Sequence, residues 1–211
     1  MQALKKLALA LAAGALALGS HVAPAADDLT MDAAALVQTL RKGGCTIVMR
    51  HASSPREVPT AAEAAPGNSP PERQLDAKGK DTARAMGEAL RRLQIPVSAV
   101  ASSPTWRARE TAMEAKFPKP TLVAELGDGG QSMAATGNAQ AAWLQQKVAQ
   151  PVHGGNTVVI THYPNLRAAF PEAAAEMADG EALVFAPDAG GAPRMVRRVR
   201  IEEWPSMADR K

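Results

Sequence analysis

Unbroken apolar runs alternate with segments of helical periodicity along this chain, and the alternation predicts an α/β fold. Residues 45–50 (CTIVMR) and 156–162 (NTVVITH) lack the alternation of apolar and polar positions that marks a half-solvated strand, so we expect strands buried on both faces. Residues 75–94 instead place Met86 and Leu90 on one face of a helix. Strands separated by helices of this length form mainly parallel sheets through right-handed crossovers.

Weaker patterns predict the other elements of a single domain over residues 26–211. Ser103 and Pro104 suit the N-cap and the first position of a helix. Residues 54–74 are rich in Pro, Ala and Ser without a period, so we expect a long loop that is either disordered or covers a site. The patterns further predict helices over 29–44, 103–116 and 138–150, strands over 97–103 and 120–126, and a terminal hairpin over 181–187 and 193–201 at the sheet edge.

The first 25 residues have the composition of a secretory signal peptide. A basic start is followed by an apolar run over 7–19 and by Ala23-Pro24-Ala25, an A-x-A cleavage signal. A membrane anchor needs about 20 apolar residues, and this Ala-rich run is shorter. We therefore expect a periplasmic or secreted protein without stable membrane insertion after the leader is cleaved.

Charge and cysteine content exclude two further classes of protein. Without Lys5 and Lys6, which leave with the leader, 22 of the 24 Lys and Arg remain against 21 Asp and Glu, a net charge near +1. That balance gives no basic footprint, so we expect no nucleic-acid partner. Cys45 is the only cysteine, so the chain forms no intramolecular disulfide, and its apolar strand favours a buried filler over a reactive thiol.

Cationic side chains stand where three of the predicted strands end. Arg50 and His51 end the first strand, Arg107 lies one turn into the helix after residues 97–103, and His162 ends the strand over 156–162. Ligands of such sheets bind beyond the carboxyl ends of the strands, so we expect these four groups to converge. Two arginines, two histidines and nearby helix N-termini favour a dianion, and phosphate fits the planar fork of arginine.

A histidine among arginines is predicted to be a nucleophile. Like charges disfavour its protonated form, which leaves a neutral ring with a free lone pair near neutral pH. Attack of His51 on phosphorus would give a phosphohistidine and split hydrolysis into two transfers. The surrounding cations would stabilise the phosphoryl oxygens during each transfer.

Four motifs of the chain together resemble the histidine phosphatase superfamily, also called phosphoglycerate-mutase-like. They are RHA at 50–52, LDAKGKDTA at 75–83, SSPTWRARETA at 102–112 and THYPNL at 161–166. The resemblance spans about 45–201 and implies a three-layer α/β/α fold, His51 as the phosphorylated residue, and Arg50, Arg107 and His162 as the phosphate pocket. It also implies an enzyme without metal or cofactor. Ala52 and Thr161 depart from the family, which more often has glycine at both places.

The family's proton donor for the leaving oxygen is usually an acidic residue in a loop after the third strand, where this chain reads AELGDGGQSM. Glu125 is the first choice because it stands where a strand would end, and Asp128 is the second. Without either, good leaving groups or phosphohistidine would be favoured as substrates. Ser54 is a neutral phosphate donor or a turn residue, and Arg73 is a further cation for the substrate or a surface residue.

These observations predict an exported phosphatase that hydrolyses phosphomonoesters of small molecules or phosphosugars through His51. One alternative is a phosphatase specific for phosphorylated lipopolysaccharide core sugars. The other is a non-catalytic protein that binds phosphate ligands.

Overall fold

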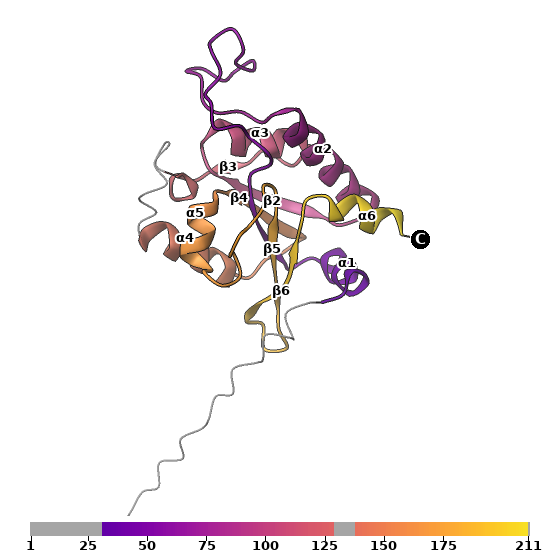
Figure 1. The fold of residues 1–211 in the computed structure, drawn as a ribbon. Helices are drawn as coiled ribbons and strands as arrows, with labels where there is room; N and C mark the ends of the chain where they lie inside the picture. Colours follow the sequence, from indigo (N-terminus) through magenta and orange to yellow (C-terminus); the bar gives the residue numbers. More distant parts are fainter. Residues whose placement is uncertain (1–30, 129–137, 211) are drawn as a thin grey trace, which may run out of the picture.

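The computed structural model describes residues 31–128 and 138–210, which form one mixed sheet covered by helices on both faces (Figure 1). The strand order is β3-β2-β4-β1-β5-β6, with the first four strands parallel and the last two antiparallel. The strands are β1 Thr46–Arg50, β2 Val97–Ser102, β3 Thr121–Leu122, β4 Asn156–Thr161, β5 Ala182–Pro187 and β6 Pro193–Val199. The mainly parallel sheet and the edge hairpin confirm the predicted fold class. The predicted leader lies outside the described residues.

The helices make the two outer layers of the three-layer fold. They are α1 Ala33–Lys42, α2 Ala77–Arg92, α3 Trp106–Glu114, α4 Asn138–Ala149, α5 Tyr163–Ala169 and α6 Glu203–Asp209. Buried side chains of α1, α2, α3 and α6 belong to one core cluster, and those of α4 and α5 belong to a second cluster on the other face. None of the helices in the described part of the chain is long and apolar enough to span a bilayer.

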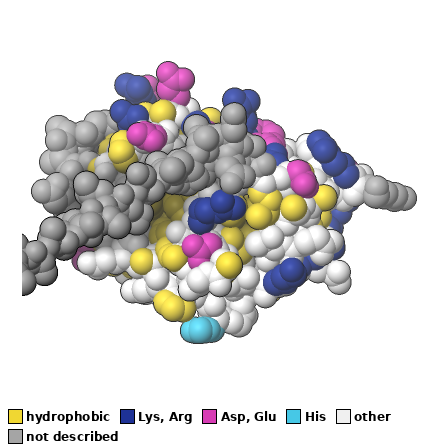
Figure 2. Space-filling model, turned by 90° about the horizontal axis from the view of Figure 1, so that it is seen from below, with side chains coloured by type: hydrophobic (Ala, Val, Ile, Leu, Met, Phe, Trp, Pro, Cys, Tyr) yellow, Lys and Arg dark blue, Asp and Glu magenta, His cyan; other side chains and the backbone are white. Residues whose placement is uncertain are grey.

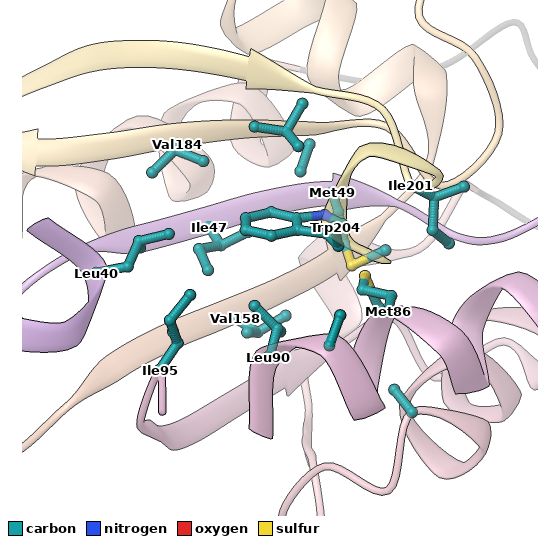
Figure 3. Close-up of a cluster of buried hydrophobic side chains, with 14 of the residues drawn as sticks. Leu40, Ile47, Met49, Met86, Leu90, Ile95, Val158, Val184, Ile201 and Trp204 are labelled. Atoms are coloured by element: carbon teal, nitrogen blue, oxygen red, sulfur yellow. The ribbon is translucent and has the colours of Figure 1, made fainter. Parts of the chain in front are cut away.

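The core explains why the strands read as continuous apolar runs. In β1, Ile47 and Met49 join the larger cluster while Val48 joins the other, so both faces of the strand are buried. Figure 3 shows Met49 beside Met86 of α2 and Trp204 of α6, on the face of the sheet that α1, α2, α3 and α6 cover. The expectation of strands without a solvated face is therefore confirmed.

The helix α3 begins two residues later than predicted. Its N-cap is Thr105, not Ser103, because the backbone of Ser103 is still held in the sheet by a 2.9 Å hydrogen bond to the Ile160 carbonyl. The Ser103 hydroxyl accepts instead from the backbone N–H of Thr105 at 3.2 Å. The backbone N–H of Trp106, at the start of the helix, donates to the carboxylate of Glu72 at 2.9 Å.

The predicted strand over 120–126 is cut short at Leu122 and continues as a single 3-10 turn, Ala124–Leu126. The reason lies in its neighbour β2. After the Val123 N–H has bonded the Ser102 carbonyl at 3.0 Å, β2 ends and turns into α3, so the later residues have no strand to pair with. Glu125 consequently lies in the turn and not at a strand end.

Two short helices, α5 and α6, were not predicted by the sequence pattern. Each has seven residues, and α5 begins directly after the histidine that ends β4. Two turns are too few for a helical period to be separated from a continued strand or a loop.

Residues 54–74 form the predicted long loop, which contains no helix or strand and rises at the end of the molecule opposite the β5–β6 turn (Figure 1). Side chains hold it together. Buried Asn68 donates to the Glu72 carbonyl at 2.8 Å and accepts from the Glu72 N–H at 2.9 Å. Gln74 accepts from the Ala65 N–H at 2.8 Å. These bonds favour an ordered loop over a disordered one.

The face of the molecule turned away from this loop carries no concentration of one charge in its described part. Figure 2 shows Lys and Arg side chains there interspersed with Asp, Glu and apolar side chains.

Gly79, in the first turn of α2, fixes how closely that helix approaches the chain after His51. A Cβ at Gly79 would lie 2.1 Å from the Ser53 carbonyl oxygen. Alanine favours a helix by about 1 kcal/mol over glycine, but a clash with backbone is not relieved by a rotamer change. We expect Gly79→Ala to lower the free energy of unfolding by about 1–3 kcal/mol, measured by urea unfolding.

The matched control is Gly190→Ala, where the nearest atom to the new Cβ is a carboxylate oxygen at 3.4 Å. We expect its stability to stay within about 0.5 kcal/mol of the original chain. Equal stability of both variants would contradict the close packing of α2 on Ser53.

Candidate active site

Three buried side chains meet at the carboxyl ends of β1, β4 and β2, which are neighbours in the sheet. His51 follows β1, His162 follows β4, and Arg107 lies in the first turn of α3 after β2. Their exposed fractions are 4%, 2% and 3%, in that order. The histidine rings are 5.2 Å apart between centroids and inclined by 63°. The structure thus brings together residues that lie more than a hundred positions apart in the chain.

The hydrogen bonds of His51 define its tautomer. Its Nδ1 lies 2.8 Å from the Ala52 carbonyl oxygen, which only accepts, so Nδ1 carries the proton. Its Nε2 accepts from Nε of Arg107 at 3.2 Å and therefore presents a lone pair. Burial lowers the pKa of His51 to about 3, and the charges of Arg107, Arg50 and Arg73 add to this lowering. The ring is neutral across the physiological range, as a nucleophile must be.

His162 has the opposite tautomer. Its Nδ1 lies 3.2 Å from Nη2 of Arg107, a group that only donates, so Nδ1 accepts. Its Nε2 then donates to the Ser103 hydroxyl at 2.9 Å, with Thr105 Oγ1 at 3.3 Å. Burial, followed by the charges of His51 and Arg107, lowers the pKa of His162 well below its ordinary value. Ser103 thereby orients the second histidine, a role that its expected place as a helix cap did not suggest.

Asp128 completes the cluster. It is buried, its Oδ2 pairs with Nη2 of Arg107, and the same oxygen lies 3.7 Å from Nδ1 of His162. Its other oxygen, Oδ1, is buried without a hydrogen-bond partner among the described residues. Asp128 is therefore the carboxylate that belongs to this cluster.

Glu125, the first choice from the sequence, does not join the cluster. It is exposed on the 3-10 turn and makes no hydrogen bond or ion pair among the described residues. The structure thus reverses the order of the two candidates. The cause is the early end of β3, which places Glu125 on the surface and carries the chain inward only at Leu126 and Asp128.

Thr161 and Asn165 hold the segment that leads to Asp128. The Thr161 hydroxyl donates to the Leu126 carbonyl at 2.8 Å. The Asn165 amide donates to the carbonyls of Leu126 and Gly127 at 3.0 and 2.9 Å and to Thr161 Oγ1 at 2.9 Å. The hydroxyl at position 161, where the family more often has glycine, thus has a structural use. Asn165 lies in the THYPNL motif at 161–166, but the sequence does not indicate which groups its side chain bonds.

Arg50 lies at the margin of the pocket with its guanidinium already engaged. Its Nη2 pairs with Asp179 at 2.6 Å, and its Nη1 donates to the Met177 carbonyl at 2.9 Å. The guanidinium also stands 5.7 Å from the centre of the Tyr163 ring. Arg50 therefore connects the end of β1 to the segment before β5.

Ser54 and Cys45 have local structural roles. The Ser54 hydroxyl donates to the Gln74 carbonyl at 2.8 Å, so its proton is used within the loop and the turn interpretation is favoured over a phosphate contact. Cys45 is fully buried in the larger core cluster, and burial raises the pKa of its thiol to about 11. That thiol is an apolar filler, as its strand predicted.

This arrangement is suited to transfer of an anionic group to nitrogen. It offers a neutral imidazole with its lone pair toward a guanidinium, a second imidazole, and a carboxylate on the same guanidinium. Positive groups around a nucleophile stabilise the charge on phosphoryl oxygens. In the described part of the chain, no group of three or more His, Cys, Asp or Glu is placed to hold a metal ion. Metal independence stays a prediction.

Comparison with known proteins gives one family match. Residues 46–126 match the histidine phosphatase superfamily (branch 1), a match that contains His51 and Arg107 and ends before Asp128 and His162. No sequence among the curated proteins matches.

Solved structures share the fold at low identity. The protein histidine phosphatase SixA complexed with tungstate is 18% identical, with a TM-score of 0.55 over 75% of this chain and 98% of the other. A candidate phosphohistidine phosphatase SixA from Nakamurella multipartitia is 19% identical, with a TM-score of 0.52 over 74% and 95%. A mutant phosphoserine phosphatase from Entamoeba histolytica in complex with phosphoserine is 12% identical, with a TM-score of 0.51 over 75% and 98%.

The low pKa of His51 predicts a loss of stability in acid. Between its ordinary pKa near 6.5 and about 3, the unfolded chain binds a proton at this ring and the folded chain does not. Stability therefore falls as the pH drops below about 6.5. We expect the loss between pH 7.5 and pH 5, measured by urea unfolding, to be about 2 kcal/mol smaller in His51→Gln than in the original chain.

The control is His153→Gln, since His153 is exposed. It should lose the same free energy of unfolding as the original chain over this range. An equally large loss in His51→Gln would mean that the folded ring takes up the proton.

Proposed function

We propose that the chain, which matches the histidine phosphatase superfamily (branch 1) over residues 46–126 and shares the fold of the protein histidine phosphatase SixA, hydrolyses phosphate monoesters through a phosphoryl group carried on Nε2 of His51. The observation that carries this proposal is the tautomer of His51. Its Nδ1 proton is held by the Ala52 carbonyl, and its Nε2 lone pair lies beside the Arg107 guanidinium. A phosphoryl group bound by Arg107 would lie within reach of that lone pair.

The reaction has two transfers. First the Nε2 lone pair attacks phosphorus, the bond from phosphorus to the ester oxygen breaks, and that oxygen takes a proton. Then water attacks the phosphohistidine, phosphate leaves with the oxygen of water, and His51 regains its lone pair. The guanidinium of Arg107 and the ring of His162, which share a hydrogen bond, stabilise the phosphoryl oxygens in both steps.

Asp128 is the residue that we assign as proton donor to the leaving oxygen. It is the buried carboxylate on Arg107, and one of its oxygens is unpaired among the described residues. An entering phosphate takes its place on the guanidinium, and the displaced carboxyl group, once protonated, can give its proton to the ester oxygen.

The same ion pair favours a second substrate class. While Asp128 is paired with Arg107 it carries no proton to donate. An enzyme in that state hydrolyses substrates whose leaving group departs without protonation, and phosphohistidine is such a substrate. We propose phosphohistidine as the alternative substrate on this ground.

We further propose that the enzyme acts outside the cytoplasm. The support is the basic start, the apolar run and the A-x-A signal within residues 1–25. Phosphorylated core sugars of lipopolysaccharide would then be accessible substrates, along with soluble monoesters.

Trapping of the intermediate tests the proposed function. The purified protein is mixed briefly with p-nitrophenyl phosphate, quenched in alkali, where phosphohistidine is stable, and analysed by peptide mass spectrometry. We expect a phosphoryl group on His51 and hydrolysis of the ester, and we expect His51→Ala to lose at least about a thousandfold in rate. His153→Ala, at an exposed histidine, is the matched control and should keep full activity. Phosphate binding without turnover would instead identify a non-catalytic binder.

Leaving-group dependence tests the role of Asp128. We expect Asp128→Asn to slow the hydrolysis of an alkyl phosphate, such as glycerol phosphate, by about 10²–10⁴-fold, because alkoxide departs poorly without a proton. Hydrolysis of p-nitrophenyl phosphate should change by only a few-fold. Glu125→Gln is the control and should leave both rates unchanged, since Glu125 is exposed and outside the cluster. Equal effects of Asp128→Asn on both esters would remove Asp128 as the acid and favour phosphohistidine as the substrate.

A further inference from the structure

Arg73 lies near the cluster of His51, His162 and Arg107 and has no carboxylate partner among the described residues. Arg107 pairs with Asp128, and Arg50 pairs with Asp179. Arg73 forms no ion pair among the described residues, and its two hydrogen bonds go to neutral carbonyls. Arg73 thus makes no direct ion pair among the described residues, although the charges of Asp128 and Asp179 act on it from a longer distance.

The loop fixes where this charge stands. Arg73 donates from Nε to the Pro55 carbonyl at 2.6 Å and from Nη2 to the Ser54 carbonyl at 3.0 Å. These carbonyls lie three and four residues beyond His51, on the chain that leaves the pocket. The preceding residue, Glu72, is bonded to the first N–H of α3, the helix that carries Arg107. Arg73 is therefore held between the exit from His51 and the start of α3.

The electrostatics agree with this position. The positive charge of Arg73 helps to lower the pKa of both His51 and His162. Burial lowers the pKa of Arg73 itself, and the nearby charge of Arg56 lowers it further. The negative charges of Asp128 and Asp179 raise the pKa of Arg73, but each of these carboxylates is already paired with another arginine.

A half-buried guanidinium without a counter-ion is costly, because it has given up water without gaining a charged partner. A guanidinium has five N–H donors, and the two carbonyls use two of them. Three donors therefore remain for a ligand.

We propose that Arg73 binds a second anionic group of the substrate, next to the phosphoryl group that His51 attacks. This inference rests on the proposed function. It predicts a substrate class: phosphate esters whose organic part carries a carboxylate or a further phosphate near the ester oxygen. Arg56, exposed on the same loop, extends the positive surface outward for that group.

The test uses pairs of substrates that differ only in this second charge. Carboxyphenyl phosphates with the carboxylate at the 2-, 3- or 4-position are compared with their neutral methyl esters, and kcat/KM is measured for each. We expect at least one carboxylate to be preferred about tenfold or more over its ester. Arg73→Gln should abolish that preference by lowering kcat/KM for the charged esters more than for the neutral esters. Arg73→Lys should keep part of the preference, because it keeps the charge but not the fork.

Arg41→Gln is the matched control, because Arg41 also donates from Nε to a backbone carbonyl, that of Leu93 at 2.7 Å, but lies in α1. It should keep the full preference. The inference is overturned if the original chain hydrolyses all pairs equally, or if Arg73→Gln slows charged and neutral esters by the same factor. Equal slowing of both kinds of ester would mean that Arg73 binds the reacting phosphate or only stabilises the loop.

A protein that is not a phosphatase can be distinguished from one that lacks an anion site at Arg73. If the original chain hydrolyses none of these esters and His51 is never phosphorylated, binding is measured by calorimetry with benzylphosphonate and its carboxylated analogues. Tighter binding of a carboxylated analogue that is lost in Arg73→Gln would still support the anion site. Equal binding of all analogues would overturn it.

Discussion

Burial of several cation-capable side chains at one point is the constraint on which this site depends. His51, His162 and Arg107 are almost fully enclosed where three neighbouring parallel strands end. Three positive charges so close together and so far from water would be strongly unfavourable. The protein meets the constraint by keeping both rings neutral and by pairing the remaining charge with Asp128. The neutral ring that results is also the form in which histidine acts as a nucleophile.

The surrounding contacts keep these partners in place. Ser103 holds one ring of the pair from the end of β2, and the Ala52 carbonyl holds the other. Thr161 and Asn165 hold the backbone that leads to Asp128. Each of these bonds selects one tautomer or one position, so the reacting groups are oriented before a substrate arrives.

The pairing of Asp128 with Arg107 means that an incoming anion competes with a carboxylate already in the pocket. In the proposed function, binding of phosphate would release Asp128, which would connect substrate recognition to the step that needs a proton donor. Arg73 differs from the pocket arginines in having only carbonyl partners. In the proposed function, the inner arginine would bind the reacting phosphoryl group and the loop arginine would bind the second anionic group of the substrate.

The sequence by itself determined the α/β class, the continuous strands β1 and β4, the helix α2 and the four cationic positions at the strand ends. These features are local: the period of apolar residues and the residue that follows a strand are both visible in a short window. The short helices α5 and α6 carried too little pattern to be found.

The tertiary structure alone decided which charges are paired. Asp128 and not Glu125 lies beside Arg107, because β3 ends where its neighbour β2 turns away, and β2 stands some twenty residues earlier in the chain. The bond from Arg107 to Asp128 and that from Arg73 to the chain after His51 likewise join distant residues. Ion pairs and tautomers depend on distances across the fold, and a one-dimensional pattern carries no such distances.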